Sequence, residues 1–278
     1  MNLPGFEKPP GAIAIDLDGT LLNSRTQLSA RNHEAINKCL ERGIPVIIAT
    51  SRPARIFNRI FPQELAAGCS MAVMNGAIVK GNPPLSGYFK ETLSVEITRS
   101  IVALASEFDP AIGITLELDG YEFGANWIDD LSTLWERNSA SPDMLLSIEE
   151  AIVRQPCKIA LGGLGIDIFK LADRLIHSFE NSISVVPSLF DIPLLNITSP
   201  QASKPSALRK LLNPRGISLE RVIGFGDDIP DVDMLKECGI AIAVANAVPE
   251  VKAIADYHTA SNDEDGVAIV LEQVLADM

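Results

Sequence analysis

The feature that most constrains the fold is a repeated order of short apolar segments, each ending in polar residues and followed by a stretch with helical spacing. The order is clear at 12–16, 44–53 and 70–79, and it returns at 221–228 and 239–244. Apolar strands joined through helices build a parallel sheet with crossover connections. We therefore predict an α/β fold with a Rossmann-like parallel-sheet core.

Helix start and stop signals agree with this order. Ser29 has the chemistry of an N-cap and Gly43 that of a C-cap, which predicts a helix from Ser29 to Arg42. A short helix is expected to begin near Pro53, because proline suits the first turn of a helix. Further helices of the core are predicted at 203–212, 231–238, 249–255 and 266–276.

The order changes after the turn-rich segment 81–87, which is typical of a linker. Beyond it we expect a helix at 94–107 and a hairpin at 113–124, where Asp119-Gly120 is a strong turn signal. Helical segments at 129–137 and 167–180 and strands at 157–161, 183–187 and 194–198 complete an α+β module with an antiparallel sheet. The prediction is a core domain, 1–82 plus 197–278, with an inserted domain at 83–196.

Composition excludes several classes of protein. Hydrophobic residues make up 47% and charged residues 21% of the 278 residues, which is ordinary for a globular chain. The net charge of −13 opposes general binding to nucleic acid or to anionic membranes. No apolar run reaches bilayer length, no signal peptide is visible, and the four cysteines are widely spaced. We expect a cytoplasmic protein with no nucleic-acid or membrane partner, and the oligomeric state is open.

Polar residues stand where the apolar segments end. Asp16 and Asp18 follow the first segment, and Thr50, Asn75 and Asp227 follow others. Ligands of open α/β sheets bind outside the carboxyl ends of the strands, so these side chains should converge.

Carboxylates gathered at one edge of a sheet are costly unless a cation lies among them. Asp16, Asp18, Asp227, Asp228 and Asp231 supply oxygen ligands without histidine or cysteine, a set that suits Mg²⁺. Such a cation commonly bridges carboxylate to phosphate, and the chain offers donors for a phosphoryl group in Lys204 and Thr50.

Four segments occur in order: "DLDGT" at 16–20, "ATSR" at 49–52, "SK" at 203–204 and "GDDIPD" at 226–231. Together they resemble the motifs of the haloacid dehalogenase (HAD) superfamily of phosphohydrolases. The long insert, "NGA" at 75–77 and the closing segment resemble the Cof-like subgroup, class IIB. The resemblance implies a Mg²⁺-dependent phosphatase that hydrolyses small phosphorylated metabolites, such as sugar phosphates, through an aspartyl-phosphate. The insert would then be an α+β cap.

The resemblance also implies roles for individual residues. Asp16 would be the nucleophile, and Asp18 would protonate the leaving oxygen and then activate water. Asp16, the backbone carbonyl of Asp18 and Asp227 would bind the metal, with Asp231 either a further ligand or a residue that supports the ligands. Phosphate or substrate binding would fall to Gly19, Thr50, Ser51, Arg52, Asn75, Gly76 and Lys204. Apart from the resemblance, Asn246 is expected to be a turn residue rather than a direct ligand, in a position to shape the metal loop.

Two residues depart from the family pattern. Ser51 stands where the subgroup usually has glycine, and it could share or crowd the phosphate contact. Pro230 stands where asparagine is usual, and it offers no hydrogen-bond donor. Asp227 and Asp231 are retained, so activity is still expected.

Other functions stay open at this point. A phosphomutase of the same superfamily would return the phosphoryl group to its substrate rather than to water. A receiver-like signalling module also joins an aspartate cluster, a threonine and a lysine on a parallel sheet, but Asp18 and the insert argue against it. A catalytically impaired metabolite-binding protein is suggested by Pro230. In a purely structural interpretation, Asp16, Asp18 and Thr50 would cap turns or helices and Lys204 would be a surface residue. Asn75 would then only make a hairpin turn with Gly76.

Overall fold

The computed structural model describes residues 9–126, 139–188 and 192–278. By its internal contacts the chain forms two compact units. The core unit consists of Met1–Ser51, Phe57–Phe89 and Lys204–Met278, and the insert unit consists of Arg52–Ile56 and Lys90–Ser203. The sequence suggested junctions at residues 82 and 197, whereas these contacts divide the chain at 89 and 203, with a short additional crossing at 52–56.

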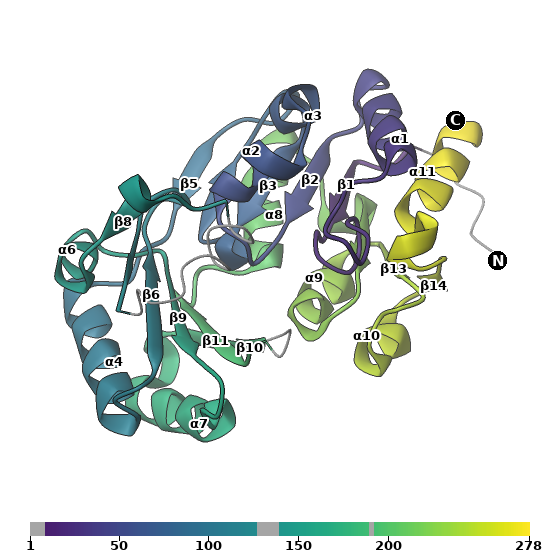
Figure 1. Cartoon of the computed structure of the whole chain (residues 1–278). Helices are drawn as coiled ribbons and strands as arrows, with labels where there is room; N and C mark the ends of the chain where they lie inside the picture. The colour runs from purple at the N-terminus through teal and green to yellow at the C-terminus, as the bar shows by residue number, and fades with distance from the viewer. Residues whose placement is uncertain (1–8, 127–138, 189–191) are drawn as a thin grey trace. The chain divides into compact units, whose positions relative to one another are not determined.

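The core unit is built on an eight-stranded sheet in the order β14-β13-β12-β1-β2-β3-β4-β5 (Figure 1). The pairs from β14 to β3 are parallel, as predicted, and β4 is antiparallel to β3. The strands are β1 (Ala12–Ile15), β2 (Val46–Ala49), β3 (Ser70–Val73), β4 (Ile78–Lys80), β5 (Tyr88–Lys90), β12 (Val222–Gly226), β13 (Ile240–Ala243) and β14 (Tyr257–His258).

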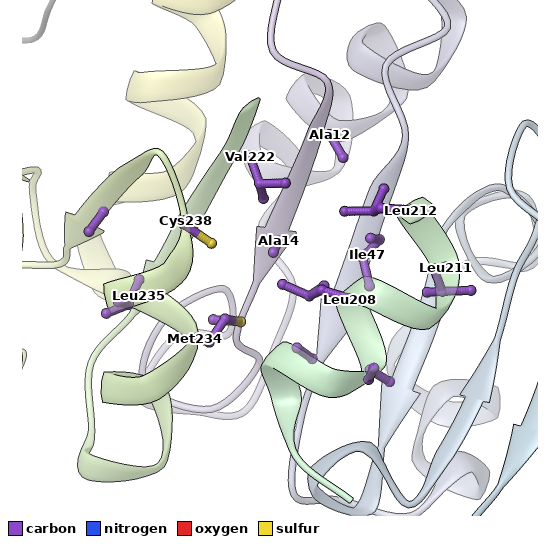
Figure 2. Close-up of a cluster of buried hydrophobic side chains, with 14 of the residues drawn as sticks. Ala12, Ala14, Ile47, Leu208, Leu211, Leu212, Val222, Met234, Leu235 and Cys238 are labelled. Atoms are coloured by element: carbon purple, nitrogen blue, oxygen red, sulfur yellow. The ribbon is translucent and has the colours of Figure 1, made fainter. Parts of the chain in front are cut away.

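Alternate side chains of the central strands pack against helices. Ala12 and Ala14 of β1 share a buried apolar cluster with Leu208 and with Met234 (Figure 2). Helices α1 and α11 pack against each other elsewhere in the unit (Figure 1). The helices are α1 (Ala30–Glu41), α2 (Phe57–Ile60), α3 (Gln63–Gly68), α8 (Lys204–Leu212), α9 (Val232–Glu237), α10 (Pro249–Ile254) and α11 (Gly266–Ala276).

The predicted ends of α1 are confirmed. The Ser29 side chain accepts a hydrogen bond from the Asn32 backbone N–H at 3.0 Å, which satisfies a free donor of the first turn. Gly43 follows the helix with a φ of +76°, a value that glycine adopts without a steric penalty. A 3₁₀ turn, Ala54–Ile56, starts the short helical segment predicted near Pro53.

The segment 70–79 is not the single strand that its apolar run predicts. Met74 and Asn75 take positive φ angles of 52° and 57°, and the turn Met74–Gly76 reverses the chain into β4. The neighbouring turn-rich segment 81–87 joins β4 to β5. The Asn82 side chain donates to the Cys69 carbonyl at 2.7 Å, and Leu85 is buried in the core. The reversal agrees with the alternative interpretation of Asn75-Gly76 as a hairpin turn.

The insert unit has a six-stranded sheet in the order β10-β11-β9-β6-β7-β8. The pairs are antiparallel except for β7 with β8, so the predicted sheet type is largely confirmed. The strands are β6 (Gly113–Glu117), β7 (Phe123–Ala125), β8 (Leu145–Leu146), β9 (Lys158–Gly162), β10 (Ser184–Ser188) and β11 (Leu194–Thr198). The predicted helix at 129–137 lies outside the described residues.

The two faces of this second sheet differ in polarity. Leu116 and Ile159 belong to an apolar core with Ile101 of α4 and Leu171 of α7. Successive residues of a strand point to opposite faces, and the alternate positions include the polar residues Thr115 and Glu117 of β6, Lys158 of β9, and Asn196 and Thr198 of β11. The helices of the unit are α4 (Val95–Phe108), α6 (Ile148–Val153) and α7 (Ile168–Phe179). None of the helices within the described ranges combines the length and apolarity needed to span a membrane.

Candidate active site

The predicted convergence of polar residues at the strand ends occurs within the core unit. Strands β12, β1, β2 and β3 are neighbours and run parallel. Asp227, Asp16 and Thr50 directly follow the first three, and Asn75 follows β3 by two residues. Their carboxyl ends meet at one edge of the sheet, where open α/β sheets bind ligands.

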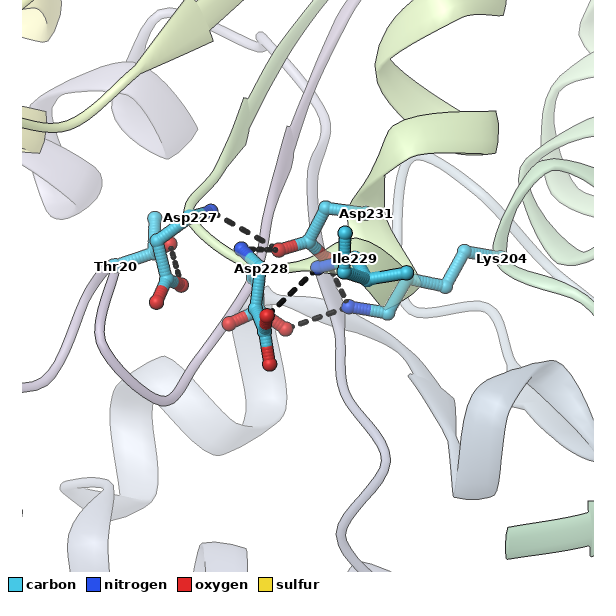
Figure 3. Close-up of polar contacts among 7 residues, drawn as sticks. Thr20, Lys204, Asp227, Asp228, Ile229 and Asp231 are labelled. Atoms are coloured by element: carbon cyan, nitrogen blue, oxygen red, sulfur yellow. Dashed lines mark hydrogen bonds and ion pairs between the residues drawn. The ribbon is translucent and has the colours of Figure 1, made fainter. Parts of the chain in front are cut away.

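Lys204 joins two of the aspartates across a long stretch of sequence. Its Nζ lies 2.5 Å from Oδ1 of Asp16 and also donates to Oδ1 of Asp231 (Figure 3). All three side chains are buried. Lys204 is the first residue of α8, where a cation opposes the helix dipole. The two carboxylates compensate this cost, so the structural interpretation of Lys204 as a surface residue is wrong.

Asp231 organises the loop that follows β12. Its Oδ2 accepts hydrogen bonds from the backbone N–H groups of Asp227 and Asp228, at 3.0 and 3.1 Å. Asp228 in turn caps the following 3₁₀ turn by accepting from the Ile229 N–H at 2.8 Å. Both oxygens of Asp231 are therefore engaged within the protein, whereas Asp228 serves the local turn.

Asp227 lies against the turn that follows Asp18. Thr20 donates its hydroxyl to Oδ1 of Asp227 at 2.6 Å (Figure 3). Gly19 has a φ of +77°, and a Cβ there would lie 2.2 Å from Oδ2 of Asp227. Only glycine permits this approach. Asn246 donates to the Gly19 carbonyl at 2.7 Å, so this turn residue also fixes the acidic loop.

Burial makes the group of Lys204 and its neighbouring aspartates electrostatically costly. The pKa of Asp16 is raised well above its ordinary value, first by desolvation and then by repulsion from Asp231, with Lys204 opposing both. Desolvation likewise raises the pKa of Asp227 to about 7, against the hydrogen bond from Thr20. Although burial disfavours the Lys204 ammonium, attraction to Asp16 and Asp231 raises its pKa above the usual range. One ammonium leaves this group of carboxylates short of positive charge.

The same carboxylates could hold a metal ion. Asp16, Asp227 and Asp231 each offer an oxygen within 4.8 Å of the others. The donor set consists of carboxylate oxygens alone, and the raised pKa values of Asp16 and Asp227 show that added positive charge would be favourable there. The chemistry of the site therefore fits a hard divalent cation.

The opposite side of the site contains Thr50 and Asn75. Thr50 is buried, and its carbonyl accepts from the Asn75 backbone N–H at 3.0 Å. Asn75 has a left-handed backbone, and its buried Oδ1 has no hydrogen-bond partner within the described part of the protein. A buried polar atom without a partner is costly, so this amide is a candidate for contacting a ligand.

The structure brings together most, but not all, of the residues predicted from the sequence. Asp16, Lys204, Asp227 and Asp231 form one contiguous group. Asp18 and Gly19 lie in the adjoining turn, Thr50 and Ser51 follow β2, and Asn75 and Gly76 follow β3. Arg52 belongs to the insert unit.

Sequence reasoning missed one contact of this group. The contact from Thr20 to Asp227 was missed, although Thr20 belongs to the quoted "DLDGT" segment and could have been found there.

Comparison with known proteins identifies the family to which the chain belongs. Residues 13–271 match the family of haloacid dehalogenase-like hydrolases. Phosphatase YwpJ of Bacillus subtilis is 30% identical over 291 aligned residues, which cover 95% of this chain and 99% of that protein. The 5-amino-6-(5-phospho-D-ribitylamino)uracil phosphatase YitU of the same organism is 26% identical, over 96% of this chain and 98% of that protein.

Solved structures share the fold. A haloacid dehalogenase-like hydrolase from Bacteroides thetaiotaomicron has a TM-score of 0.82 and 25% identity, over 95% of this chain and 99% of that chain. The subclass IIB sugar phosphatase BT4131 has a TM-score of 0.79 at 20% identity, over 96% of this chain and 99% of that chain. The chain therefore belongs to the haloacid dehalogenase-like hydrolases, in their Cof-like group, and is a phosphatase.

Proposed function

We propose that this phosphatase hydrolyses small phosphorylated metabolites through a phosphoryl group carried on Asp16, with Mg²⁺ as its metal. The observation that carries the proposal is the contact of Lys204 with Asp16 at the end of β1, beside Asp227 and Asp231. A buried carboxylate with a fixed ammonium partner and a nearby metal-binding set is suited to nucleophilic attack on phosphorus.

Asp16 and Asp18 divide the chemistry. A carboxylate oxygen of Asp16 attacks phosphorus, and the bond from phosphorus to the ester oxygen breaks. Asp18 donates a proton to that leaving oxygen. Asp18 then takes a proton from a water molecule, which attacks the phosphorus of the aspartyl-phosphate and releases inorganic phosphate. Asp16 is thereby restored.

The surrounding residues hold the phosphoryl group. Lys204 neutralises charge on Asp16 and faces the oxygens that gain charge during transfer. Thr50 supplies a hydroxyl donor from the end of β2, whereas the unpartnered Asn75 amide oxygen at the end of β3 is an acceptor and would receive a hydroxyl of the substrate. Gly19, Ser51, Arg52 and Gly76 are the other residues that we assign to phosphate or substrate.

Asp16, Asp227 and the backbone carbonyl of Asp18 would hold the metal. Asp231 supports them, since its oxygens already accept from Lys204 and from two backbone N–H groups. When bound, Mg²⁺ would neutralise phosphate charge and draw the phosphoryl group toward Asp16. The oxygen-only donor set favours this ion over softer metals.

The insert unit would act as a cap that excludes water and contacts the rest of the substrate. A cap of this size favours small esters over folded phosphoproteins. The relative named for 5-amino-6-(5-phospho-D-ribitylamino)uracil supports a substrate of metabolite size.

The test is phosphate release from a panel of sugar phosphates and other phosphomonoesters. Activity should require Mg²⁺, disappear in EDTA, and fall by on the order of 10⁴-fold in Asp16→Asn. Asp228→Asn is the matched control, because its carboxylate caps a turn beside the site. Failure of the wild-type protein to release phosphate from any ester would refute the proposal, and full activity in Asp16→Asn would refute the assignment of the nucleophile.

A further inference from the structure

Residues 19–22, the turn that follows Asp18, are held by three asparagines from other parts of the core unit. Each asparagine donates its Nδ2 group to a backbone carbonyl of the turn. The pairs are Asn246 with Gly19 at 2.7 Å, Asn32 with Leu21 at 3.1 Å and Asn262 with Leu22 at 2.8 Å. Asn32, Asn246 and Asn262 are called the asparagine clamp below.

Backbone groups fix the clamp residues in turn. Oδ1 of Asn32 accepts from the Ala268 N–H of α11 at 2.9 Å, and Oδ1 of Asn246 accepts from the Asn262 N–H at 3.0 Å. Asn32 lies on α1 and is 1% exposed, and Asn262, in the loop before α11, is 8% exposed. An amide that donates through its nitrogen and accepts through its oxygen has one orientation. The clamp can therefore hold the turn in one position.

Hydrogen bonds within the turn carry this restraint to Asp18. The N–H groups of Leu21 and Leu22 both donate to the Leu17 carbonyl, at 3.1 and 2.9 Å. Leu17 precedes Asp18 and Gly19 follows it, so the backbone on both sides of Asp18 is tied to groups that the clamp holds. Leu17, Leu21 and Leu22 are fully buried. The place of the Asp18 backbone therefore depends on the clamp.

The support behind the clamp is itself well braced. The 3₁₀ turn Asn262–Glu264 is closed by a capping box, in which the hydroxyl of Ser261 donates to Glu264 at 2.7 Å. In the same turn, Oδ1 of Asp263 accepts from the Ser24 N–H at 2.8 Å, two residues beyond the held carbonyls. A catalytic side chain needs such a support, because a misplacement of about 1 Å can reduce the rate about 100-fold.

We propose that the asparagine clamp positions Asp18 as the acid that protonates the leaving oxygen. Its members are positioning residues, because they act through the backbone of the turn. Without one of these amides, Asp18 would lose its alignment with the leaving oxygen, while attack by Asp16 would continue. This inference rests on the phosphatase activity proposed above, and it adds the residues that orient the acid.

The test compares two aryl-containing esters of similar size that differ in their need for an acid. The benzyl alkoxide is a poor leaving group that must gain a proton, whereas 4-nitrophenolate leaves without one. The value of kcat/KM covers the steps up to phosphoryl transfer to Asp16, in which Asp18 acts as the acid. Asn262→Ala should lower kcat/KM for benzyl phosphate at least about tenfold more than for 4-nitrophenyl phosphate, because a positioned acid contributes about 10²–10⁴-fold. Saturating Mg²⁺ keeps metal affinity out of the comparison.

Asn82→Ala is the matched control. Asn82 is also 8% exposed, lies in the same unit and donates its Nδ2 group to the Cys69 carbonyl at 2.7 Å. Its loss should lower stability, but the ratio of the two kcat/KM values should not change, because that ratio does not depend on the folded fraction. Asn246→Ala, at an exposed position, should change the ratio in the same direction as Asn262→Ala, even if the latter does not fold.

Asp18→Asn shows whether the clamp acts through the acid. This variant should itself lower the ratio of benzyl to 4-nitrophenyl phosphate, and Asn262→Ala added to it should lower the ratio no further. A further fall in the double variant would mean that the clamp acts on another group, and the proposal would be overturned.

Two outcomes separate this proposal from the general one. If the wild-type protein hydrolyses neither ester and no other phosphomonoester, the phosphatase mechanism fails, and the role of the clamp fails with it. If the wild type is active but Asn262→Ala and Asn246→Ala keep its ratio, the positioning role is refuted while the phosphatase stands.

Discussion

The core unit and the insert unit each bury a cluster of charged groups, but the charges of the two clusters are compensated differently. In the core unit, one lysine, Lys204, lies among three carboxylates. In the insert unit, one carboxylate, Glu117, lies among cations that include Arg55 and Lys158. A buried cluster with excess charge of one sign is costly unless it serves a ligand of the other sign. The first cluster suits a metal cation, whereas Glu117 and Arg55 of the second compensate each other through two hydrogen bonds.

The largest effect is expected in the core cluster. Lys204→Met removes the ammonium that faces both Asp16 and Asp231, so kcat/KM should fall by about 10³-fold. Added Mg²⁺ should stabilise the variant more than the wild type, because the carboxylates lose their protein cation. The measurement is phosphate release together with thermal unfolding with and without Mg²⁺. Lys236→Met, at an exposed lysine of α9, is the control. Equal activity in the two variants would remove Lys204 from the mechanism.

The ion pair between Arg55 and Glu117 in the insert unit should affect the stability of the protein more than its catalysis. Arg55→Met or Glu117→Gln leaves a buried group without its partner, so each should lower the free energy of unfolding by about 3–5 kcal/mol. The double variant Arg55→Met with Glu117→Met should cost less than the sum of the single changes.

The matched control for this pair is Arg99 with Glu149, a two-bond pair of the same unit whose side chains are 53% and 61% exposed. Its removal should cost less than about 1 kcal/mol. Equal costs for the two pairs in urea unfolding would contradict the importance given to burial.

The pH dependence of stability tests Lys158. Its pKa falls from 10.5 to about 8 on folding, because burial penalises the ammonium. Between pH 8 and 10.5 the unfolded chain keeps a proton that the folded chain has lost, so the folded state gains stability as pH rises through this range. Relative to Lys158→Met, the wild type should gain about 3 kcal/mol over that range. If the difference in free energy of unfolding between the wild type and Lys158→Met does not vary with pH, the lowered pKa of Lys158 is refuted.

The smallest effect is expected at Pro230, which replaces the usual asparagine. It lies in the 3₁₀ turn that Asp228 and Asp231 cap, where its fixed φ suits the backbone. Pro230→Asn should lower the free energy of unfolding by about 0.4–1 kcal/mol and change kcat by less than about tenfold. A much larger gain in kcat would show that the natural enzyme lacks a catalytic contact.

The sequence predicted those parts of the molecule that depend on local pattern. The apolar strands and their polar ends located Asp16, Thr50 and Asp227 at one edge of a parallel sheet, and order along the chain added Lys204. The reversal at 74–76 was predicted only as an alternative, a hairpin turn of Asn75 with Gly76, because the positive φ of the apolar Met74 leaves no signal in an apolar run.

The charged cluster of the insert unit was beyond prediction for a different reason. Arg55 and Glu117 are 62 residues apart, and their contact depends on how a turn of one segment packs on a hairpin of another. Lys158 stands in a predicted strand, but only the register shows that it lies opposite Glu117. Register and packing between distant segments are properties of the folded chain.

The most direct test of the central claim is to identify the residue that carries the phosphoryl group. Asp18→Asn should still permit attack on phosphorus by Asp16 for an ester with a good leaving group, but it should slow the attack of water. Acid quenching of this variant after mixing with such an ester and Mg²⁺, followed by mass spectrometry of its peptides, should find the phosphoryl group on Asp16. A phosphoryl group on any other residue, or steady hydrolysis of the ester with none bound to the protein, would contradict the account.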